Sequence, residues 1–354
     1  MSRDTVSEAE NDPRNGSAAP GDLSSLTGAA DRLCRQQFGD GVFIRGIVEF
    51  SNVCARDCLY CGIRGSRRDV DRYVMKPEEV LAAVSAGYAA GLRSFVLQSG
   101  EAPVYSVDDF CRLVEAVHTM CGDPVAVTLS VGERSRSEYR RLFDAGADRF
   151  LMRFESANPR VYALNHPGCR LEERFEALET LREIGFETGT GFLIGIPYEE
   201  PDDFERNLEA LIAFRPHMAG LGPFIPAEGT PAADFPPGSY DKVLEAYSRI
   251  RLALPKINLA AATALDSLVP EGRYRALHAG ANVYMPNLTP ALFRNRYRLY
   301  ARKTAADAFD GWRQQLETDL SAFDRRPLWN EIGTSLMLKE EKGGRCRESG
   351  NGMR

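Results

Sequence analysis

The sequence predicts an α/β fold, a TIM-type (β/α)8 barrel, and two features of the chain lead to this prediction. Short runs of apolar and β-branched residues alternate with amphipathic helical patterns, which is the order that a parallel sheet of βα units requires. Polar or glycine-containing groups follow nearly every apolar run, at the strand ends where a barrel carries its functional loops. A chain of 354 residues is long enough to form such a barrel as one domain.

Eight runs are predicted to be strands, because each is short, apolar and bounded by turn-forming residues. Eight βα units suit a closed barrel better than an open sheet, while the number of strands alone leaves closure undecided. In chain order the predicted strands are Val42–Phe50, Ser94–Gln98, Val125–Ser130, Arg149–Phe154, Thr188–Ile194, Gly220–Phe224, Asn258–Ala262 and Asn282–Met285.

Amphipathic stretches between these runs are predicted to be helices. In Pro77–Ala90, a proline opens the first turn, Glu78 and Glu79 lie at the positive end of the helix dipole, and Gly91 follows the last turn. The other predicted helices are Val107–Met120, with Ser106 as its cap, Arg136–Asp144, Leu171–Glu183, Pro201–Phe214 and Tyr240–Leu252.

The barrel domain is predicted to span residues 23–335. Residues 1–22 are polar and rich in small side chains, and residues 336–354 are charged and glycine-rich without periodic apolar positions. Because such segments bury too little apolar surface to offset the entropy of folding, both ends are predicted to be disordered.

Composition argues against several classes of partner. The net charge of −6 gives no broad positive field, and the chain lacks a dense Lys/Arg block, so nucleic acid is not an expected partner. Neither a signal peptide nor an apolar run long enough to span a membrane is present, so a soluble, cytoplasmic protein is expected. Eight cysteines are too few for a disulfide scaffold of this length, and a tight group of them indicates a metal or redox site.

Such a group is present directly after the first predicted strand. Cys54, Cys58 and Cys61 lie within eight residues on a segment that has to be a loop. Thiolates select soft metal centres, and clustered cysteines suit the short iron spacing of a [4Fe-4S] cluster. Three ligands leave one iron open to another group.

The three cysteines allow two other interpretations, a zinc site and free structural thiols. A structural zinc site needs four closed ligands, and no fourth Cys or His lies near, since His118, His166, His217 and His278 are scattered. The cysteines could also be free structural residues, which is the interpretation given to the isolated thiols Cys34, Cys111, Cys121, Cys169 and Cys346.

The pattern CxxxCxΦC, with the aromatic Tyr60 before the last cysteine, resembles the signature of the radical S-adenosylmethionine (SAM) superfamily. The resemblance implies that the open iron binds the amino and carboxylate groups of SAM. It also implies SAM contacts from the strand-end group Ser99, Gly100 and Glu101, which is similar to the superfamily's GGE-like motif. A plain strand-to-helix turn is the alternative there.

Two opposite charges are candidates to hold the methionine end of SAM. Glu155 ends the fourth predicted strand and suits an ammonium group, whereas Arg174, in the next helix, suits a carboxylate through its forked donors. Surface charge is the default interpretation of either residue, and the family resemblance favours the binding role.

A closer resemblance links the chain to the HydE-type maturases of [FeFe]-hydrogenase. It rests on ordered segments between about residues 42 and 300, including IVEFSNVCARDCLYCGIR, VLQSGEAP, RFESANP, GFLIGIP, GLGPFIPAEGTP and GANVYMPNLTP. The resemblance implies radical chemistry on a mononuclear iron that carries cysteine, carbon monoxide and cyanide. It also implies two companion maturases and a one-electron reductant as partners.

Matching these motifs also suggests which residues line the cavity. Thr128, Arg153, Thr263, Met285 and Tyr297 fall where the family lines its cavity, with Met218 and Tyr297 also assigned to the cofactor and Arg45 to the substrate. Arg45 and Arg153 lie in or at the end of apolar strands, where an unpaired charge is costly, so each requires an anionic ligand or a carboxylate partner. For the threonines, Met285 and Tyr297, ordinary strand or core packing is the alternative.

The chain also departs from the family pattern. Some relatives carry a second cluster bound by cysteines after the position of Tyr300, but residues 301–315 contain none here, so one cluster is expected. A paired threonine of the relatives is Ala262-Thr263 in this chain.

Three rival functions remain open at this stage. A methylornithine-synthase-like mutase would share the barrel but bind an amino acid. A biotin-synthase-like enzyme would need a second cluster deep in the barrel. A non-catalytic iron-sulfur scaffold would not turn over SAM.

Overall fold

The computed structural model describes residues 23–300 and 311–349, and its centre is a parallel β-sheet that curls into a barrel. The predicted disorder of residues 1–22 lies outside the described residues. The strands are, in sheet order, β12 (Arg326–Leu328), β1 (Gly41–Ile44), β11 (Val283–Tyr284), β10 (Asn258–Ala260), β8 (Met218–Gly220), β6 (Glu187–Thr190), β5 (Ala147–Leu151), β4 (Ala126–Ser130), β3 (Ser94–Ser99) and β2 (Gly46–Ser51).

The first predicted strand closes the barrel. It forms as two pieces, β1 and β2, separated only by Arg45, and β1 pairs with β11 while β2 pairs with β3. Backbone hydrogen bonds run along the whole seam, including Phe43 N to Asn282 O and Ile47 N to Pro286 O, both at 2.9 Å. The TIM-type barrel predicted from the sequence is therefore confirmed, with β12 as an extra strand outside β1.

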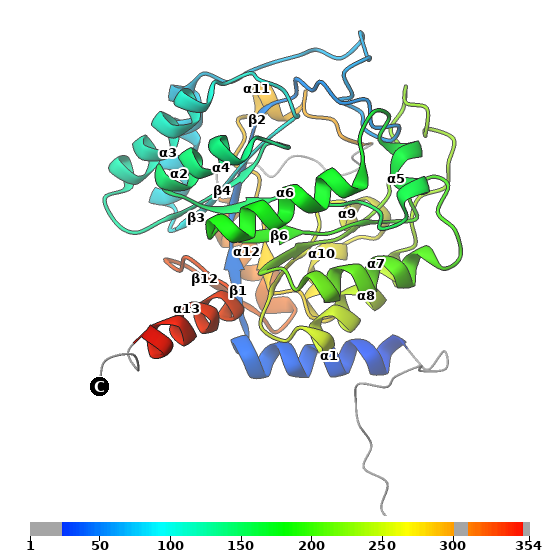
Figure 1. Cartoon of the computed structure of the whole chain (residues 1–354). Helices are drawn as coiled ribbons and strands as arrows, with labels where there is room; N and C mark the ends of the chain where they lie inside the picture. The colour runs from blue at the N-terminus through cyan, green and yellow to red at the C-terminus, as the bar shows by residue number, and fades with distance from the viewer. Residues whose placement is uncertain (1–22, 301–310, 350–354) are drawn as a thin grey trace, which may run out of the picture.

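The helices surround this sheet (Figure 1). α1 (Leu23–Phe38) lies at the end of the barrel opposite to the loop that follows β2, and it packs against α8. Each of the six predicted helices forms, with boundaries within about two residues of those expected. The remaining elements are α2 (Pro77–Ala89), α3 (Val107–Cys121), α4 (Arg136–Asp144), α5 (Pro159–Asn165), α6 (Leu171–Ile184), α7 (Asp203–Phe214), α8 (Tyr240–Ala253), α9 (Leu265–Leu268), α10 (Gly272–Leu277), α11 (Ala291–Arg294), α12 (Trp312–Ala322) and α13 (Leu336–Ser349). Among the described helices, none is long and apolar enough to cross a membrane.

Two predicted strands are each interrupted by a close approach of the backbone. The run Thr188–Ile194 forms β6 and then β7 (Leu193–Ile194), and Gly220–Phe224 divides between β8 and β9 (Gly222–Pro223). A Cβ on Gly191 would lie 2.0 Å from the carbonyl oxygen of Gly220, so only glycine fits where the two chains cross. β7 and β9 then pair with each other above the barrel.

The prediction of a disordered tail is wrong for residues 336–349, which form α13, while residues 350–354 lie outside the described residues. This helix begins at residue 336, where Met337 and Leu338 are buried, and Glu341 accepts a hydrogen bond from His217 Nε2 at 3.0 Å. The sequence shows no long periodic pattern to reveal this helix, because two apolar side chains and a few polar contacts dock it, among them those of Glu341 with His217 and of Glu340 with Lys256.

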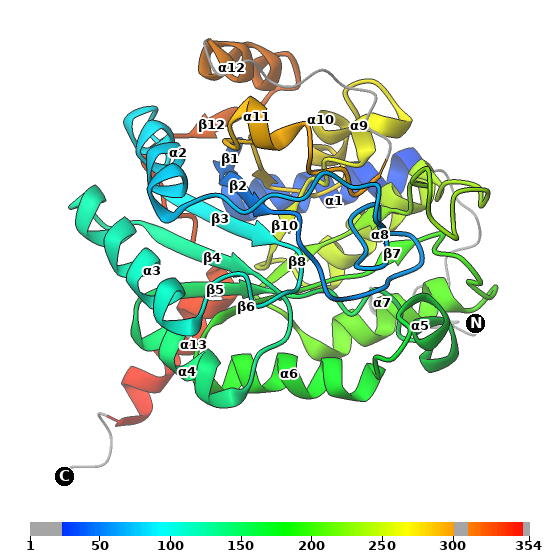
Figure 2. The same cartoon turned by 90° about the horizontal axis from the view of Figure 1, so that it is seen from above.

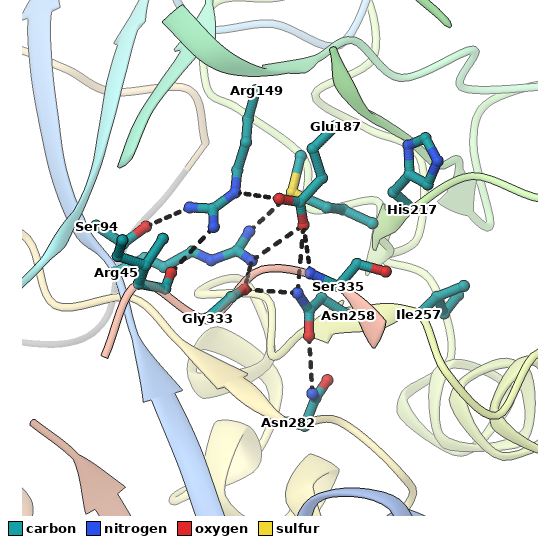
Figure 3. A network of polar contacts seen from close by, with 12 residues as sticks. Arg45, Ser94, Arg149, Glu187, His217, Ile257, Asn258, Asn282, Gly333 and Ser335 are labelled. Carbon is teal, nitrogen blue, oxygen red and sulfur yellow. Dashed lines mark hydrogen bonds and ion pairs between the residues drawn. The ribbon is translucent and has the colours of Figure 1, made fainter. Parts of the chain in front are cut away.

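An ionic network closes the amino-terminal end of the barrel (Figure 3). Arg149, fully buried, donates to Glu187 at 2.7 Å and to Ser94 Oγ at 2.7 Å. Arg45 lies 3.9 Å from Glu187 and donates to the carbonyl oxygen of Gly333 at 3.1 Å. The segment before α13 is thus bonded directly to the inner wall of the barrel.

The electrostatic balance of this network depends on Glu187. Burial disfavours its charged form, but Arg149 and Arg45 outweigh that effect and lower the pKa of Glu187. Burial and the neighbouring Arg149 lower the pKa of Arg45 to about 9, so the guanidinium group of Arg45 remains charged at neutral pH.

We predict that Glu187→Gln lowers the free energy of unfolding by about 3–5 kcal/mol, because it leaves two buried guanidinium groups without a counter-charge. Urea denaturation at pH 7 measures this loss. Since the lowered pKa of Glu187 makes its contribution vanish only as the pH falls through that value, the difference from wild type should shrink below about pH 4.

The matched control is Glu183→Gln, which breaks the exposed Arg136–Glu183 pair. Its expected cost is below about 1 kcal/mol. Equal losses in the two variants would contradict the role given to Glu187.

Candidate active site

A cavity of about 1640 Å³ opens at the carboxyl ends of the barrel strands. In Figure 2 the loop that follows β2 runs across this end of the barrel. The volume exceeds the roughly 300–1,000 Å³ of an ordinary small-molecule site, so the cavity has room for two ligands side by side. The lining includes Cys54, Tyr60, Glu155, Arg174 and Thr263, which come from opposite sides of the barrel.

The cysteine loop is held by its surroundings rather than by secondary structure of its own. Ala55 N donates to Glu101 O at 2.8 Å, Leu59 N to Asn165 O at 2.9 Å, and Gly62 N to Leu299 O at 2.8 Å. Arg72 donates to the carbonyl oxygens of Asn52, Ile63, Arg64 and Arg67. These bonds turn Cys54, Cys58 and Cys61 toward one cavity, whose wall all three form.

Glycine allows two neighbouring segments to approach this loop. A Cβ on Gly100 would lie 2.3 Å from Val53 O and 2.8 Å from Cys54 Cβ, and one on Gly62 would lie 2.1 Å from Arg298 O. Any side chain at Gly100 would therefore displace the first cysteine. Gly100 lies in the cavity wall, and Ser99 and Glu101 line the wall beside it.

The three thiols suit a cationic metal centre. Burial raises the pKa of Cys61 to about 12, and burial together with the neighbouring cysteines raises the pKa of Cys58 well above its ordinary value. A cluster that binds them as thiolates must supply the positive charge that offsets this penalty. No group of three or more His, Cys, Asp or Glu side chains in the described part of the chain is arranged to hold a metal ion as it stands, so the cluster assignment depends on the spacing of the three thiols and on the cavity wall that they share.

Glu155 is strained and only partly bonded. Its φ of 63° lies in the left-handed region, and its carboxylate lies 3.1 Å from Arg153 Nε. Its second oxygen, Oε2, is buried without a hydrogen-bond partner. Burial raises the pKa of Glu155, against the opposing effect of Arg153 and Arg174. An unpaired, buried carboxylate oxygen in a cavity wall suits a donor from a ligand.

Arg174 lies in the same wall within a four-membered ionic network. It contacts Glu133 at 2.8 Å and Glu101 at 4.0 Å, and Arg56 in turn donates to Glu101 at 2.6 Å and to Glu133 at 3.1 Å. The structure thus brings the predicted pair Glu155 and Arg174 into one cavity. Each has a protein partner there: Arg153 for Glu155 and Glu133 for Arg174. Arg174 would have to share its guanidinium group between Glu133 and a ligand carboxylate.

The opposite wall contains three of the predicted cavity residues. Tyr297 accepts a hydrogen bond from Gln98 Nε2 at 3.1 Å, Thr263 Oγ1 lies 3.0 Å from the hydroxyl of Tyr300, and Met285 lies along the lining. Arg153 projects into the same space with its side chain 32% exposed. Its required carboxylate partner is Glu155.

Three predicted site residues lie outside the cavity lining: Arg45, Thr128 and Met218. Inward-facing side chains repeat every two residues along a strand, and each of these positions is at least one step deeper than a lining residue, namely Ile47, Ser130 and Gly220. Arg45 and Met218 contact each other in the closed end of the barrel, with Nη1 2.8 Å from Sδ. Their assignment to substrate or cofactor, like that of Thr128, stays a prediction to which the cavity lining adds no support.

Sequence reasoning missed several side chains of the site. Glu49 and Glu133 line the cavity as carboxylates, and Cys169 lies in the same wall as the cysteine loop. His166, interpreted from the sequence as a packed or surface residue, also forms this wall. Position after a strand could have indicated Glu133, whereas no sequence signal places His166 or Cys169.

Comparison with known proteins identifies the family. The model of the Radical SAM superfamily matches residues 48–211. The [FeFe] hydrogenase maturase subunit HydE of Thermotoga maritima is 42% identical over 274 residues, which cover 77% of this chain and 78% of that protein. The chain belongs to the HydE family of radical SAM enzymes. This confirms the resemblance drawn from the sequence motifs.

More distant relatives of this HydE-family chain share the barrel. The 3-methylornithine synthase of Methanosarcina acetivorans is 27% identical over 267 residues, which cover 74% of each chain. The crystal structure of methylornithine synthase superposes with a TM-score of 0.76 at 23% identity, covering 88% of this chain and 91% of that one. The maturase HydG from Carboxydothermus hydrogenoformans gives 0.73 at 19% identity, covering 87% and 72%. At these identities the structural likeness establishes the fold alone.

We predict that Cys58→Ser abolishes cluster binding, because the serine hydroxyl is a hard, weakly acidic ligand that does not replace a thiolate on iron. Iron content and visible absorbance after anaerobic reconstitution measure the loss. Cys169→Ser is the matched control, since it changes a thiol in the same cavity wall and should retain the cluster. Retention in Cys58→Ser would contradict the ligand assignment.

Proposed function

We propose that this HydE-family enzyme holds a [4Fe-4S] cluster through Cys54, Cys58 and Cys61, binds SAM against it, and acts in maturation of the [FeFe]-hydrogenase diiron subsite. The chain is a radical SAM enzyme, and its 42% identity to a HydE maturase supports the role in hydrogenase maturation. The observation that carries the proposal is the convergence of three thiols on one wall of a cavity large enough for two ligands.

The cluster, when bound, supplies the electron that splits SAM into methionine and a 5′-deoxyadenosyl radical. The residues of the chain bind SAM, orient it and keep the radical confined to the cavity. Glu155 Oε2 is available to a ligand ammonium or hydroxyl group, and Arg174 offers a guanidinium group to a carboxylate. Tyr60, Ser99 and Gly100 lie beside the thiols and supply a flat ring and a close backbone for the rest of SAM.

Electrostatics favours an anionic second ligand. Arg153 is paired with Glu155, but beneath the cavity the two guanidinium groups of Arg45 and Arg149 share one carboxylate, Glu187, which leaves one positive charge in excess. An iron complex that carries cysteine, carbon monoxide and cyanide fits this field and the volume left beside SAM. We therefore propose such a complex as the substrate. Thr263, Met285 and Tyr297 are its proposed contacts.

The proposed partners follow from this chemistry. The cluster requires a one-electron reductant, and the iron complex has to pass between this enzyme and companion maturases. The structure shows free thiols at Cys34, Cys54, Cys58, Cys61, Cys111, Cys121 and Cys169, which suits a reducing compartment, and the cytoplasm is the proposed location.

We predict that the reconstituted, reduced protein converts SAM to 5′-deoxyadenosine and methionine, and that Glu155→Gln slows this release at least about tenfold by removing the charge offered to the ligand. Chromatography of anaerobic reactions measures both products. Glu200→Gln, a half-exposed carboxylate outside the cavity lining, is the control.

Substrate identity is tested in the same reactions. A HydE-like enzyme should support assembly of active hydrogenase together with the companion maturases and should leave lysine unchanged. Formation of methylornithine from lysine would instead support the function of the 27% identical relative, 3-methylornithine synthase. Absence of 5′-deoxyadenosine under all conditions would leave only a scaffold role.

A further inference from the structure

His166 links the end of α5 to the cysteine loop. It follows Asn165, the last residue of α5, and its side chain is buried. Its Nδ1 lies 3.0 Å from the carbonyl oxygen of Tyr162, and its Nε2 lies 2.8 Å from the hydroxyl of Tyr60. Tyr60 stands between two of the cysteines that are proposed to hold the cluster.

The chemistry of the groups sets the direction of these two hydrogen bonds. A carbonyl oxygen only accepts, so Nδ1 must carry the proton and donate to Tyr162 O. Burial lowers the pKa of His166 to about 4, so the ring is neutral at pH 7 and its Nε2 is a lone acceptor. The hydroxyl of Tyr60 therefore donates to Nε2. The backbone of α5 thus fixes the Nδ1–H tautomer of His166. That tautomer in turn requires the hydroxyl of Tyr60 to be the donor.

Packing restricts both rings further. The Tyr162 ring stacks on His166 with centroids 4.4 Å apart, and Tyr60 meets His166 edge-on at 5.5 Å. Tyr60 also packs on the small apolar cluster of Val161, Leu193 and Ile196. Leu59 N donates to Asn165 O at 2.9 Å, so the end of α5 binds both residues that lie between Cys58 and Cys61.

A histidine that only filled space would not need this arrangement. The single acceptor atom of the neutral imidazole, Nε2, accepts the hydrogen bond from Tyr60, and the side chains of His166 and Tyr60 both line the cavity. Loss of that bond would leave a buried acceptor and a buried hydroxyl without partners, and Tyr60 could then leave its place in the wall.

We propose that His166 is a positioning residue that sets the orientation of Tyr60 and, through it, the SAM-binding face of the cysteine loop. This inference rests on the proposed function, because it assumes that SAM binds at this wall. His166 itself contacts neither the thiols nor the reacting atoms; it acts through the tyrosine hydroxyl.

We predict that His166→Phe raises the KM for SAM about five- to tenfold with a smaller change in kcat, as expected for loss of one buried hydrogen bond that orients a binding surface. Tyr60→Phe should give the same shift, and the double variant should be no worse than either single variant. His166→Gln should restore KM to within about twofold, because its amide can donate to Tyr162 O and accept from Tyr60.

A second readout does not depend on turnover. Amide hydrogen exchange of residues 58–61 should be faster in His166→Phe and Tyr60→Phe than in wild type, and close to wild type in His166→Gln. The matched control is His118→Phe, since His118 also bonds a backbone carbonyl, Gly146 O at 2.9 Å, but lies outside the cavity lining. It should change neither KM nor exchange in the loop.

The possible results distinguish failure of the positioning role of His166 from failure of the proposed function. Unchanged KM and unchanged loop exchange in His166→Phe would overturn the positioning role while SAM cleavage by the wild type stands. Additive effects of the two phenylalanine substitutions would overturn it as well. If the wild type cleaves no SAM, the proposed function fails, and the exchange experiment still decides whether His166 holds Tyr60. Should His166→Phe not fold, Tyr60→Phe provides the same test.

Discussion

Three thiols have to reach one point from a loop that has no regular hydrogen bonding of its own. The barrel meets this constraint by satisfying the loop from outside: the ends of β3 and α5, the segment before Tyr300 and the side chain of Arg72 each bond its backbone. Because every one of these supports comes from a different part of the chain, the site exists only once the barrel has closed. The seam between β1 and β11 is thus a condition for the proposed cluster site as well as for the fold.

The two ends of the barrel have different roles: the amino-terminal end stabilises the fold, and the carboxyl end forms the candidate active site. At the amino-terminal end, Arg45, Arg149 and Glu187 form a buried ionic layer that the segment before α13 covers. At the carboxyl end, the wall contains a strained glutamate and an ionic network whose members can exchange partners with a ligand. The closed end gives the cavity a rigid base with excess positive charge, and the open end keeps polar groups available for binding.

Much of this arrangement could be predicted from the sequence. Strand and helix periodicity predicted the barrel, and the spacing of Cys54, Cys58 and Cys61 predicted the proposed cluster site, because both signals are local. Depth inside the barrel is not local: Arg45, Thr128 and Met218 face inward as expected but lie beneath the cavity, and only the register of neighbouring strands fixes that. His166 and α13 were missed for the same reason, since each is defined by contacts with residues far away in the sequence.

The central claim is that the three cysteines leave one iron open and that SAM binds to it through its methionine end. Electron–nuclear double resonance of the reduced cluster, with SAM labelled with ¹⁵N in its amino group, tests this most directly. If SAM binds the open iron through its amino group, the spectrum should show a clear hyperfine coupling between the cluster and the labelled nitrogen. Full occupancy of the cluster with SAM bound to the protein but without any such coupling would contradict it.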